Sequence, residues 1–216
     1  MNILNRNFYK RPTYEVAEGL IGKKLVRLIY GRSPQILSGI IVETEAYGCE
    51  DDEASHAFNG LTVKNSMMFG GPGRAYVYLS YGIHFCFNIT AYSPNHRAGA
   101  VLIRAIQPVA GVSTMRRLRA TDDPFLIASG PGRLTKALDI GLNHNGVDVT
   151  FPNPIIVETG VIPAAVLVSS RVGISTAKNK QWRYVFGHLN RRTGLPSYTR
   201  YASKYNQTYS RICRSK

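Results

Sequence analysis

Short apolar segments that end at turn residues are the feature that most limits how this 216-residue chain can fold. Residues 39–47, for example, carry β-branched side chains at Ile40, Ile41, Val42 and Thr44. Short segments of this kind, separated by glycine and proline, predict strands. The predicted strands lie within residues 24–30, 39–47, 75–90, 98–106, 155–158 and 165–168. We expect one α+β domain over residues 1–216, with a curved, mainly antiparallel sheet and helices around it.

Three segments predict helices. Residues 14–20 follow Thr13, which can cap the first turn of a helix. Residues 111–120 form a basic helix with its apolar side chains on one face. Residues 133–140 follow a Gly-Pro-Gly turn and end at Gly141, as a helix closed by glycine does.

Residues 75–90 predict a β-hairpin that protrudes from the sheet, with Ser80-Tyr81-Gly82 as its turn. Residues 191–216 form a basic, tyrosine-rich C-terminal extension. Four of its tyrosines follow one another at steps of three and four residues, which predicts a helix with one aromatic face. They are Tyr198, Tyr201, Tyr205 and Tyr209. Packing against the protein explains such a face more simply than base stacking does.

Charge is distributed unevenly along the chain. There are 27 Lys and Arg residues and 13 Asp and Glu residues, a net charge of +14. Six of the acids lie in residues 43–53, which contain no basic residue, whereas residues 171–216 hold 11 basic residues and no acid. A positively charged body indicates a polyanionic partner, most simply a nucleic acid. Charge alone also fits a basic protein with no nucleic-acid role.

Several classes of protein do not fit. No apolar run reaches the roughly 18 residues of a membrane span, and the first residues lack the apolar core of a signal peptide. Cys49, Cys86 and Cys213 are far apart and odd in number, so neither a disulfide framework nor a zinc finger is indicated. We expect no membrane partner. The short N-terminus favours a bacterial cytoplasm, in association with the nucleoid, or a nucleus if the source is eukaryotic.

Two carboxylates and an aromatic residue alternate along the strand predicted at residues 39–47. Residues two apart share a face of a strand, so Glu43, Glu45 and Tyr47 point the same way. One interpretation is a general base beside a stacking platform. The other is a solvated outer face with a salt bridge to an arginine. This segment alone does not decide between them.

Four consecutive acids, Glu50-Asp51-Asp52-Glu53, follow this strand and precede His56. Such a run suggests a divalent-metal site, but adjacent residues rarely converge on one ion. A solvated connection that brings His56 back toward Glu45 is the simpler hypothesis.

Tyrosines concentrate in the predicted hairpin. Tyr76 and Tyr78 share one face, and Tyr81 lies at the turn, where an exposed aromatic side chain is unfavourable unless it is used. The functional hypothesis is a wedge inserted into DNA by Tyr81, with Tyr78 facing a pocket. Cross-strand aromatic packing accounts for Tyr76 and competes as an explanation for Tyr78.

One glycine-rich turn could contact phosphate. Gly130-Pro131-Gly132 precedes the helix predicted at 133–140, and backbone amides at a helix start can bind a phosphate. A plain helix entry turn explains the same residues.

Taken together, these segments resemble the alkyladenine (3-methyladenine) DNA glycosylase family, the mammalian type that lacks a helix–hairpin–helix. The resemblance covers roughly residues 13–190, in the family's order. Its stretches are Glu43-Thr44-Glu45-Ala46-Tyr47, Ala54-Ser55-His56-Ala57, Met68-Phe69-Gly70 with Pro72-Gly73, Tyr76-Val77-Tyr78, Tyr81-Gly82, Cys86 with Asn88, Val101-Leu102-Ile103-Arg104-Ala105, Gly130-Pro131-Gly132-Arg133-Leu134, Ser170-Arg171-Val172-Gly173-Ile174 and Trp182-Arg183.

The resemblance implies a role for each matching residue. Glu45 matches the carboxylate that activates water, and Arg104 matches the arginine that helps to hold that carboxylate and its water. Tyr81 matches the wedge that fills the place of the extruded base. The base pocket implied by the resemblance consists of Tyr47, His56, Tyr78 and Asn88. Gly132, Arg133 and Arg171 are candidate phosphate-binding residues.

One departure from the family pattern follows Tyr47. The family usually has glycine two residues after this tyrosine, whereas here Gly48-Cys49 brings the glycine one position closer. Since the loop from Tyr47 to His56 keeps its length, we expect a changed surface and an intact pocket.

The resemblance implies a monomeric, monofunctional glycosylase that takes damaged purines from double-stranded DNA without a metal or cofactor. A metal-dependent nuclease built on Glu43, Glu45 and the acidic run is one alternative. A basic, non-catalytic RNA- or DNA-binding protein is the other.

Overall fold

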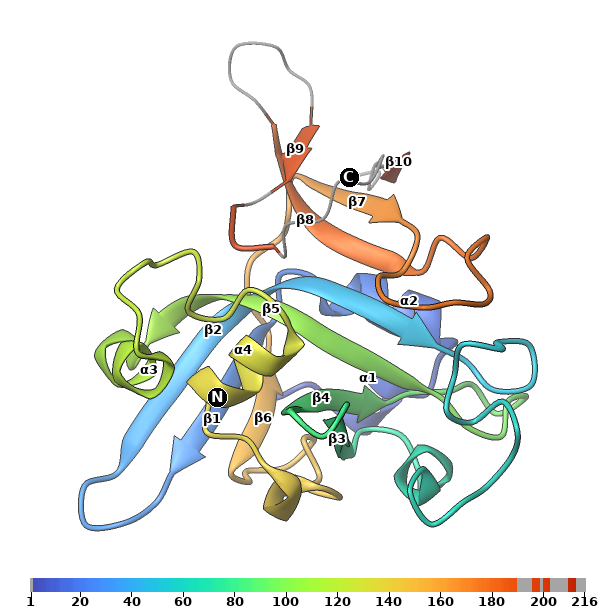
Figure 1. Cartoon of the computed structure of the whole chain (residues 1–216), viewed down its shortest axis with the longest axis horizontal. Coiled ribbons are helices and arrows are strands. Elements are labelled where there is room, and N and C mark those ends of the chain that lie inside the picture. The colour runs from blue at the N-terminus through green and yellow to red at the C-terminus, as the bar shows by residue number, and fades with distance from the viewer. Residues whose placement is uncertain (1, 190–195, 199, 203–209, 213–216) are drawn as a thin grey trace.

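A computed structural model describes residues 2–189, 196–198, 200–202 and 210–212 of the chain (Figure 1). Its ten described strands form one antiparallel sheet in the order β10-β7-β8-β2-β5-β4-β3, with β1 beside β2, β6 beside β1 and β9 beside β8. The strands are β1 (Lys24–Ile29), β2 (Gln35–Tyr47), β3 (Ala75–Ser80), β4 (His84–Thr90), β5 (Ala100–Ala110), β6 (Ile155–Glu158), β7 (Ala165–Ser169), β8 (Arg183–Leu189), β9 (Pro196–Tyr198) and β10 (Ser210–Ile212). The α+β class and the antiparallel sheet are confirmed.

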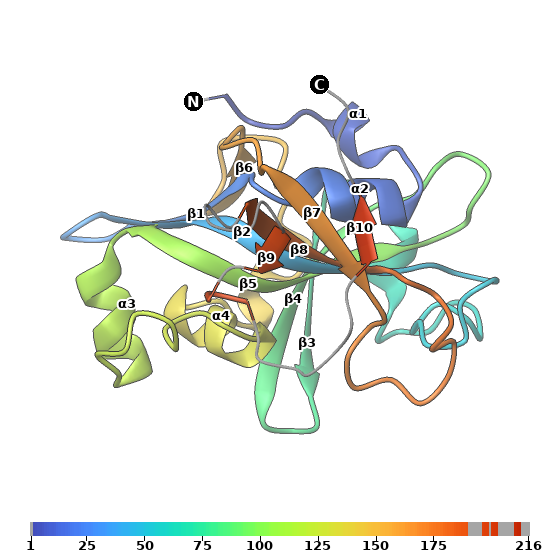
Figure 2. The same ribbon diagram turned by 90° about the horizontal axis from the view of Figure 1, so that it is seen from above.

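The helices are short and lie on both sides of the sheet. They are α1 (Arg6–Tyr9), α2 (Thr13–Leu20), η1 (Ser66–Phe69), α3 (Val112–Arg119), α4 (Pro131–Ala137) and η2 (Leu142–His144). Figure 2 shows α1 and α2 on one side, and α3, α4 and the β3–β4 hairpin on the other. Buried apolar side chains such as Leu20, Ile41, Phe87 and Ile103 fill the core between these layers. Among the described residues, no helix is both long and apolar enough to span a membrane.

Two helix boundaries differ from the prediction. Helix α2 begins at Thr13 itself, and Pro12 takes the capping position without a side-chain hydrogen bond. Helix α4 begins at Pro131 rather than Arg133 and ends at Ala137. Proline is suited to a first helical turn because its fixed φ fits the helix and its missing N–H is not needed there.

The predicted tyrosine helix of the C-terminal extension is wrong in the part that is described. Tyr198 ends strand β9 and Tyr201 lies in a turn. Tyr205 and Tyr209 lie outside the described residues. Strand β9 pairs with β8, and β10 pairs with β7, so pairing to distant strands overrides the local spacing.

Strands β2 and β5 form the centre of the sheet, and their pairing is irregular beside the two glutamates. Glu43 pairs with Ala105 and Thr44 with Ile103, so Arg104 is an extra residue on β5. Such β-bulges redirect a side chain, and they are common next to active sites. The bulge here directs the side chain of Arg104 toward the carboxylates of β2.

Candidate active site

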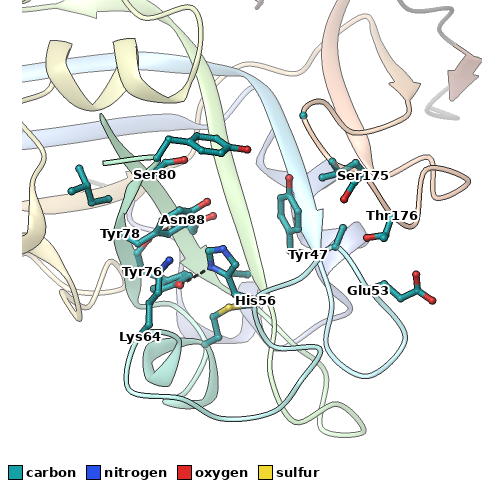
Figure 3. A pocket seen from close by; sticks show the side chains of 17 residues that line it. Tyr47, Glu53, His56, Lys64, Tyr76, Tyr78, Ser80, Asn88, Ser175 and Thr176 are labelled. Atoms are coloured by element: carbon teal, nitrogen blue, oxygen red, sulfur yellow. Dashed lines mark hydrogen bonds between the residues drawn. The ribbon is translucent and has the colours of Figure 1, made fainter. Parts of the chain in front are cut away.

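A cavity of about 450 Å³ opens beside the end of β2. Tyr47, at the end of β2, lies on one side, and Tyr78 from β3 and His56 from the loop after β2 lie across from it (Figure 3). Lys64 and Asn88 also line the cavity. The residues expected to form a base pocket are thus brought together around one space, although their role in holding a base stays a prediction.

Contacts beneath the cavity fix its aromatic wall. The His56 and Tyr78 rings lie edge to face, with centroids 4.7 Å apart, and Tyr76 and Tyr78 have centroids 5.3 Å apart. Tyr76 is buried, and its hydroxyl lies 2.9 Å from Nδ1 of His56. Burial raises the pKa of Tyr76 to about 12, so its hydroxyl stays protonated. The side-chain amide of Asn88 donates to the carbonyl of Tyr76 at 3.0 Å, which fixes the orientation of Asn88.

His56 is held as a neutral ring. Burial lowers its pKa below the usual 6.5, and the positive charge of Lys64 lowers it further. Asn65 fixes the loop that carries His56 by donating to the carbonyl of His56 at 2.7 Å. A neutral imidazole can both donate and accept hydrogen bonds, which suits a polar edge of a bound base.

Replacing Lys64 should therefore raise the pKa of His56. In Lys64→Met the positive neighbour is lost, so the pKa moves up toward 6.5 while the effect of burial remains. An NMR titration of the His56 ring protons measures this shift. Lys10→Met, an exposed lysine that does not line this cavity, is the control. A pKa of His56 that stays in place or falls in Lys64→Met would contradict the assignment of Lys64 as its neighbour.

Glu45 is completely buried behind the wall of the cavity. Its Oε2 accepts from the hydroxyl of Tyr47 at 2.9 Å and from Nη1 of Arg104 at 3.1 Å. Its Oε1 accepts from the backbone N–H of Val172 at 2.7 Å. Burial, followed by the charge of Glu45, raises the pKa of Tyr47 well above 10, so Tyr47 remains the donor in this contact. The carboxylate is therefore fixed in place beside the cavity.

Glu43 anchors the same network from one side. Its Oε1 accepts from Nε of Arg104 and from Nε of Arg183, each at 2.8 Å, and all three side chains are buried. Burial alone lowers the pKa of Arg104, but Glu45 and Glu43 outweigh it, so the pKa is raised. The alternative of a solvated outer face is wrong because both glutamates are at 0 % exposure, but the salt bridge to an arginine that it included is confirmed in Arg104.

Asp52 does not belong to a solvated connection. Its two carboxylate oxygens accept from Nη1 and Nη2 of Arg171, each at 2.6 Å, and both side chains are buried. Arg171 also donates to the carbonyl of Ala46 at 2.9 Å, and its guanidinium carbon lies 4.8 Å from the centroid of the Tyr47 ring. The expectation that Arg171 binds phosphate is corrected, because Asp52 occupies its guanidinium inside the protein.

A second cavity, of about 760 Å³, adjoins the first. Tyr47, Tyr78 and Tyr81 line both cavities, and Arg104 and Val172 line the second. Gly132 and Arg133 also line the second cavity. A Cβ on Gly132 would lie 2.6 Å from the ring of His84, so no side chain fits there. Phosphate binding by Gly132 and Arg133 stays a prediction.

Tyr81 lies in the turn of the β3–β4 hairpin and lines both cavities. Its side chain is 85 % exposed, and its φ is +50°. A left-handed backbone is unfavourable for a bulky residue, and such strain concentrates at functional sites. Ile83, in the same turn, is also exposed. The hairpin thus presents an apolar tip beside the cavities.

Sequence reasoning missed three parts of this site. The backbone of Val172 contacts Glu45, and the Asp52–Arg171 pair supports the platform tyrosine. The motif Arg171-Val172-Gly173 marked the segment without showing what it contacts. Nothing in the sequence marked Lys64 as a residue of the cavity, because a lone lysine in a loop is usually solvated.

The described residues contain no group of three or more His, Cys, Asp or Glu side chains that could hold a metal ion. Glu43 and Glu45, which the nuclease alternative requires as ligands, are instead paired with buried arginines. The donor set therefore matches a fixed catalytic carboxylate better than a metal centre.

Comparisons with known proteins agree with this geometry. The model of the methylpurine-DNA glycosylase family matches residues 7–189. A relative from Chlorobium phaeobacteroides is 48 % identical over 186 residues, which is 85 % of this chain and 92 % of the relative. One from Chlorobium phaeovibrioides is 42 % identical over 91 % of this chain and 100 % of its own length. A third, from Rhodopseudomonas palustris, is 42 % identical over 84 % of this chain and 85 % of its own. All three carry names of 3-methyladenine DNA glycosylases. The chain therefore belongs to the methylpurine-DNA glycosylase family, and it is a DNA glycosylase, an N-glycosyl hydrolase of base-excision repair that acts on damaged bases in DNA.

Proposed function

We propose that this glycosylase flips alkylated or deaminated purines out of double-stranded DNA and hydrolyses the N-glycosidic bond, leaving an abasic site. The observation that carries the proposal is the position of Glu45. Its carboxylate is held by three donors directly behind an aromatic cavity. A base in that cavity would bring its sugar next to the carboxylate.

The aromatic wall favours a damaged purine. Flipping a nucleotide requires a few kcal/mol, less when the base is damaged or mispaired, and stacking on aromatic side chains returns about 1–3 kcal/mol per base. Tyr47 and Tyr78 offer such faces from opposite sides of the cavity. A positively charged alkylated purine gains further from cation–π attraction. We expect Asn88, which lines this cavity, to discriminate against the exocyclic amino group of normal guanine.

The hydrolysis needs one carboxylate and water. As the base leaves, positive charge develops on the sugar, and Glu45 both stabilises that charge and takes a proton from the attacking water. Tyr47, Arg104 and Val172 keep the carboxylate oriented through this step. No covalent intermediate with a lysine is required, so the product is an intact strand with an abasic site.

A single-turnover panel of duplexes tests this function. Each duplex carries one of 3-methyladenine, 7-methylguanine, hypoxanthine or ethenoadenine opposite its partner base. We expect release of free base from at least one duplex, in the presence of EDTA, with no strand break. An adduct trapped by borohydride would show lysine chemistry, for which Lys64 and Lys136 are the cavity lysines, and would overturn the monofunctional mechanism.

The variant Tyr81→Gly tests the role of Tyr81 as a wedge without lowering the stability of the protein. Glycine adopts the left-handed φ of +50° without strain, so the free energy of unfolding should stay equal or rise. The loss of the aromatic ring removes about 1–3 kcal/mol of stacking free energy. The equilibrium constant for capture of the flipped nucleotide should therefore fall by about 5- to 150-fold. Fluorescence of 2-aminopurine beside the lesion measures that capture. An unchanged flipping equilibrium in this variant would remove Tyr81 from the role of wedge.

The expectations of a monomer and of a cytoplasmic location stay predictions.

A further inference from the structure

The second cavity has a wall that lies outside the part of the chain matched by the family model. That match ends at residue 189, whereas Arg200 and Ala202 line the cavity. The C-terminal extension therefore contributes side chains to a cavity that shares lining residues with the base cavity.

Three contacts fix this part of the extension against the body of the protein. The guanidinium carbon of Arg200 lies 3.9 Å from the centroid of the Phe125 ring. The centroid of the Tyr201 ring lies 5.0 Å from the centroid of the Phe125 ring. Ala202 is 1 % exposed and packs with Leu167 and Val185 in a small apolar cluster. Arg200 itself is exposed and lines the cavity. Its contact with Phe125 holds the guanidinium in this position.

The second cavity is strongly basic. Arg119, Arg133 and Lys136 line it together with Arg200, and no described lining residue is a carboxylate. None of these four takes part in an ion pair between described residues. Burial, followed by the charge of Arg133, lowers the pKa of Arg119. Cations held together without an acid are unfavourable unless an anion joins them.

The position of this cavity beside the base cavity indicates that the anion is a phosphate of the DNA backbone. It shares Tyr47, Tyr78 and Tyr81 with the base cavity, and Arg104 and Val172 of the carboxylate network line it. A nucleotide whose base occupied the first cavity would therefore extend its sugar and phosphates toward the second.

On the basis of the proposed function, we infer that Arg200 of the C-terminal extension is a DNA-binding residue. It contacts a backbone phosphate next to the flipped nucleotide, in the same basic cavity as Arg119, Arg133 and Lys136. Guanidinium groups suit this task because they bind phosphate with paired N–H donors. The extension thus completes the cavity for the DNA backbone.

The salt dependence of binding tests the inference. Binding of a lesion-bearing duplex is measured from 50 to 200 mM KCl for the parent protein and for Arg200→Gln. Each lost phosphate contact reduces the slope of log K against log salt by about 0.9, so the excess Kd of the variant should shrink about 3.5-fold over this range. The loss should also appear as a higher enzyme concentration for half-maximal excision.

Two further variants make the result specific. Arg32→Gln removes an exposed arginine from the turn between β1 and β2, which lines neither cavity, and should keep the parent slope. Arg200→Lys keeps the charge and should retain most of the slope. A parental slope in Arg200→Gln, or a weakening that Arg200→Lys does not relieve, would overturn the inference. If the parent protein excises no lesion yet Arg200→Gln changes the slope, the proposed function fails and the phosphate contact stands.

Discussion

Glu45→Gln should abolish excision while the protein still binds lesion-bearing duplex. Glutamine has the shape of glutamate, and its one carbonyl oxygen can still accept from the N–H of Val172, but it can neither take a proton from water nor balance positive charge on the sugar. Removing a general base slows a reaction by about 10²–10⁴-fold. Loss of the charge at a completely buried position adds to this effect. Single-turnover excision and equilibrium binding, measured on the same duplex, separate the two steps.

Glu50→Gln is the matched control for this prediction. Glu50 belongs to the same acidic segment, but its side chain is 54 % exposed and its partner, Arg97, lies 3.8 Å away at the surface. Excision by Glu50→Gln should match the parent. Parental excision by Glu45→Gln would show that another group activates the water. Loss of duplex binding together with excision would instead show a structural role for Glu45.

The sheet could be predicted because it depends on local pattern, whereas the group of residues around the cavity was implied by the resemblance to the glycosylase family. β-branched residues and turn residues mark β2 and the hairpin, and alternation along β2 places Glu43 and Glu45 on one face. Both carboxylates indeed contact Arg104.

What could not be predicted depends on distant parts of the chain. The bulge at Arg104 arises from the pairing of β2 with β5, so no local pattern announces it. The four acids from Glu50 to Glu53 look alike in sequence, yet only Asp52 is buried, because Arg171 reaches it from 119 residues away. For the same reason, the sequence did not show that Arg171 pairs with Asp52. The tyrosine spacing of the extension failed for the same reason, since β8 and β7 draw its described parts into the sheet.

Asp52→Asn should destabilise the protein far more than any change in its exposed neighbours. The substitution keeps the volume but leaves the buried guanidinium of Arg171 without a countercharge. Removing one partner of a buried ion pair lowers the free energy of unfolding by about 3–5 kcal/mol. For a domain of this size that corresponds to a Tm lower by roughly 6–20 °C. Urea or thermal unfolding followed by circular dichroism measures the change.

The chain provides its own control in the adjacent residue. Asp51 pairs with Lys180 at 3.0 Å, and this pair connects nearly the same two segments, but its side chains are 55 % and 22 % exposed. An exposed pair contributes under about 1 kcal/mol, so Asp51→Asn should lower the free energy of unfolding by no more than that. Equal effects of Asp51→Asn and Asp52→Asn would contradict a buried pair at Asp52.

A double variant shows whether the damage comes from the unpaired charge. Removing both members of a buried pair is often neutral, so Asp52→Asn combined with Arg171→Met should be more stable than Asp52→Asn alone. Excision should not recover with stability. Arg171 packs against the Tyr47 ring and precedes Val172, whose N–H holds Glu45, so the double variant loses the support of both. If the double variant regains stability but not excision, the Asp52–Arg171 pair helps to orient the catalytic carboxylate of Glu45. A double variant that excises at the parent rate would limit the pair to a role in stability.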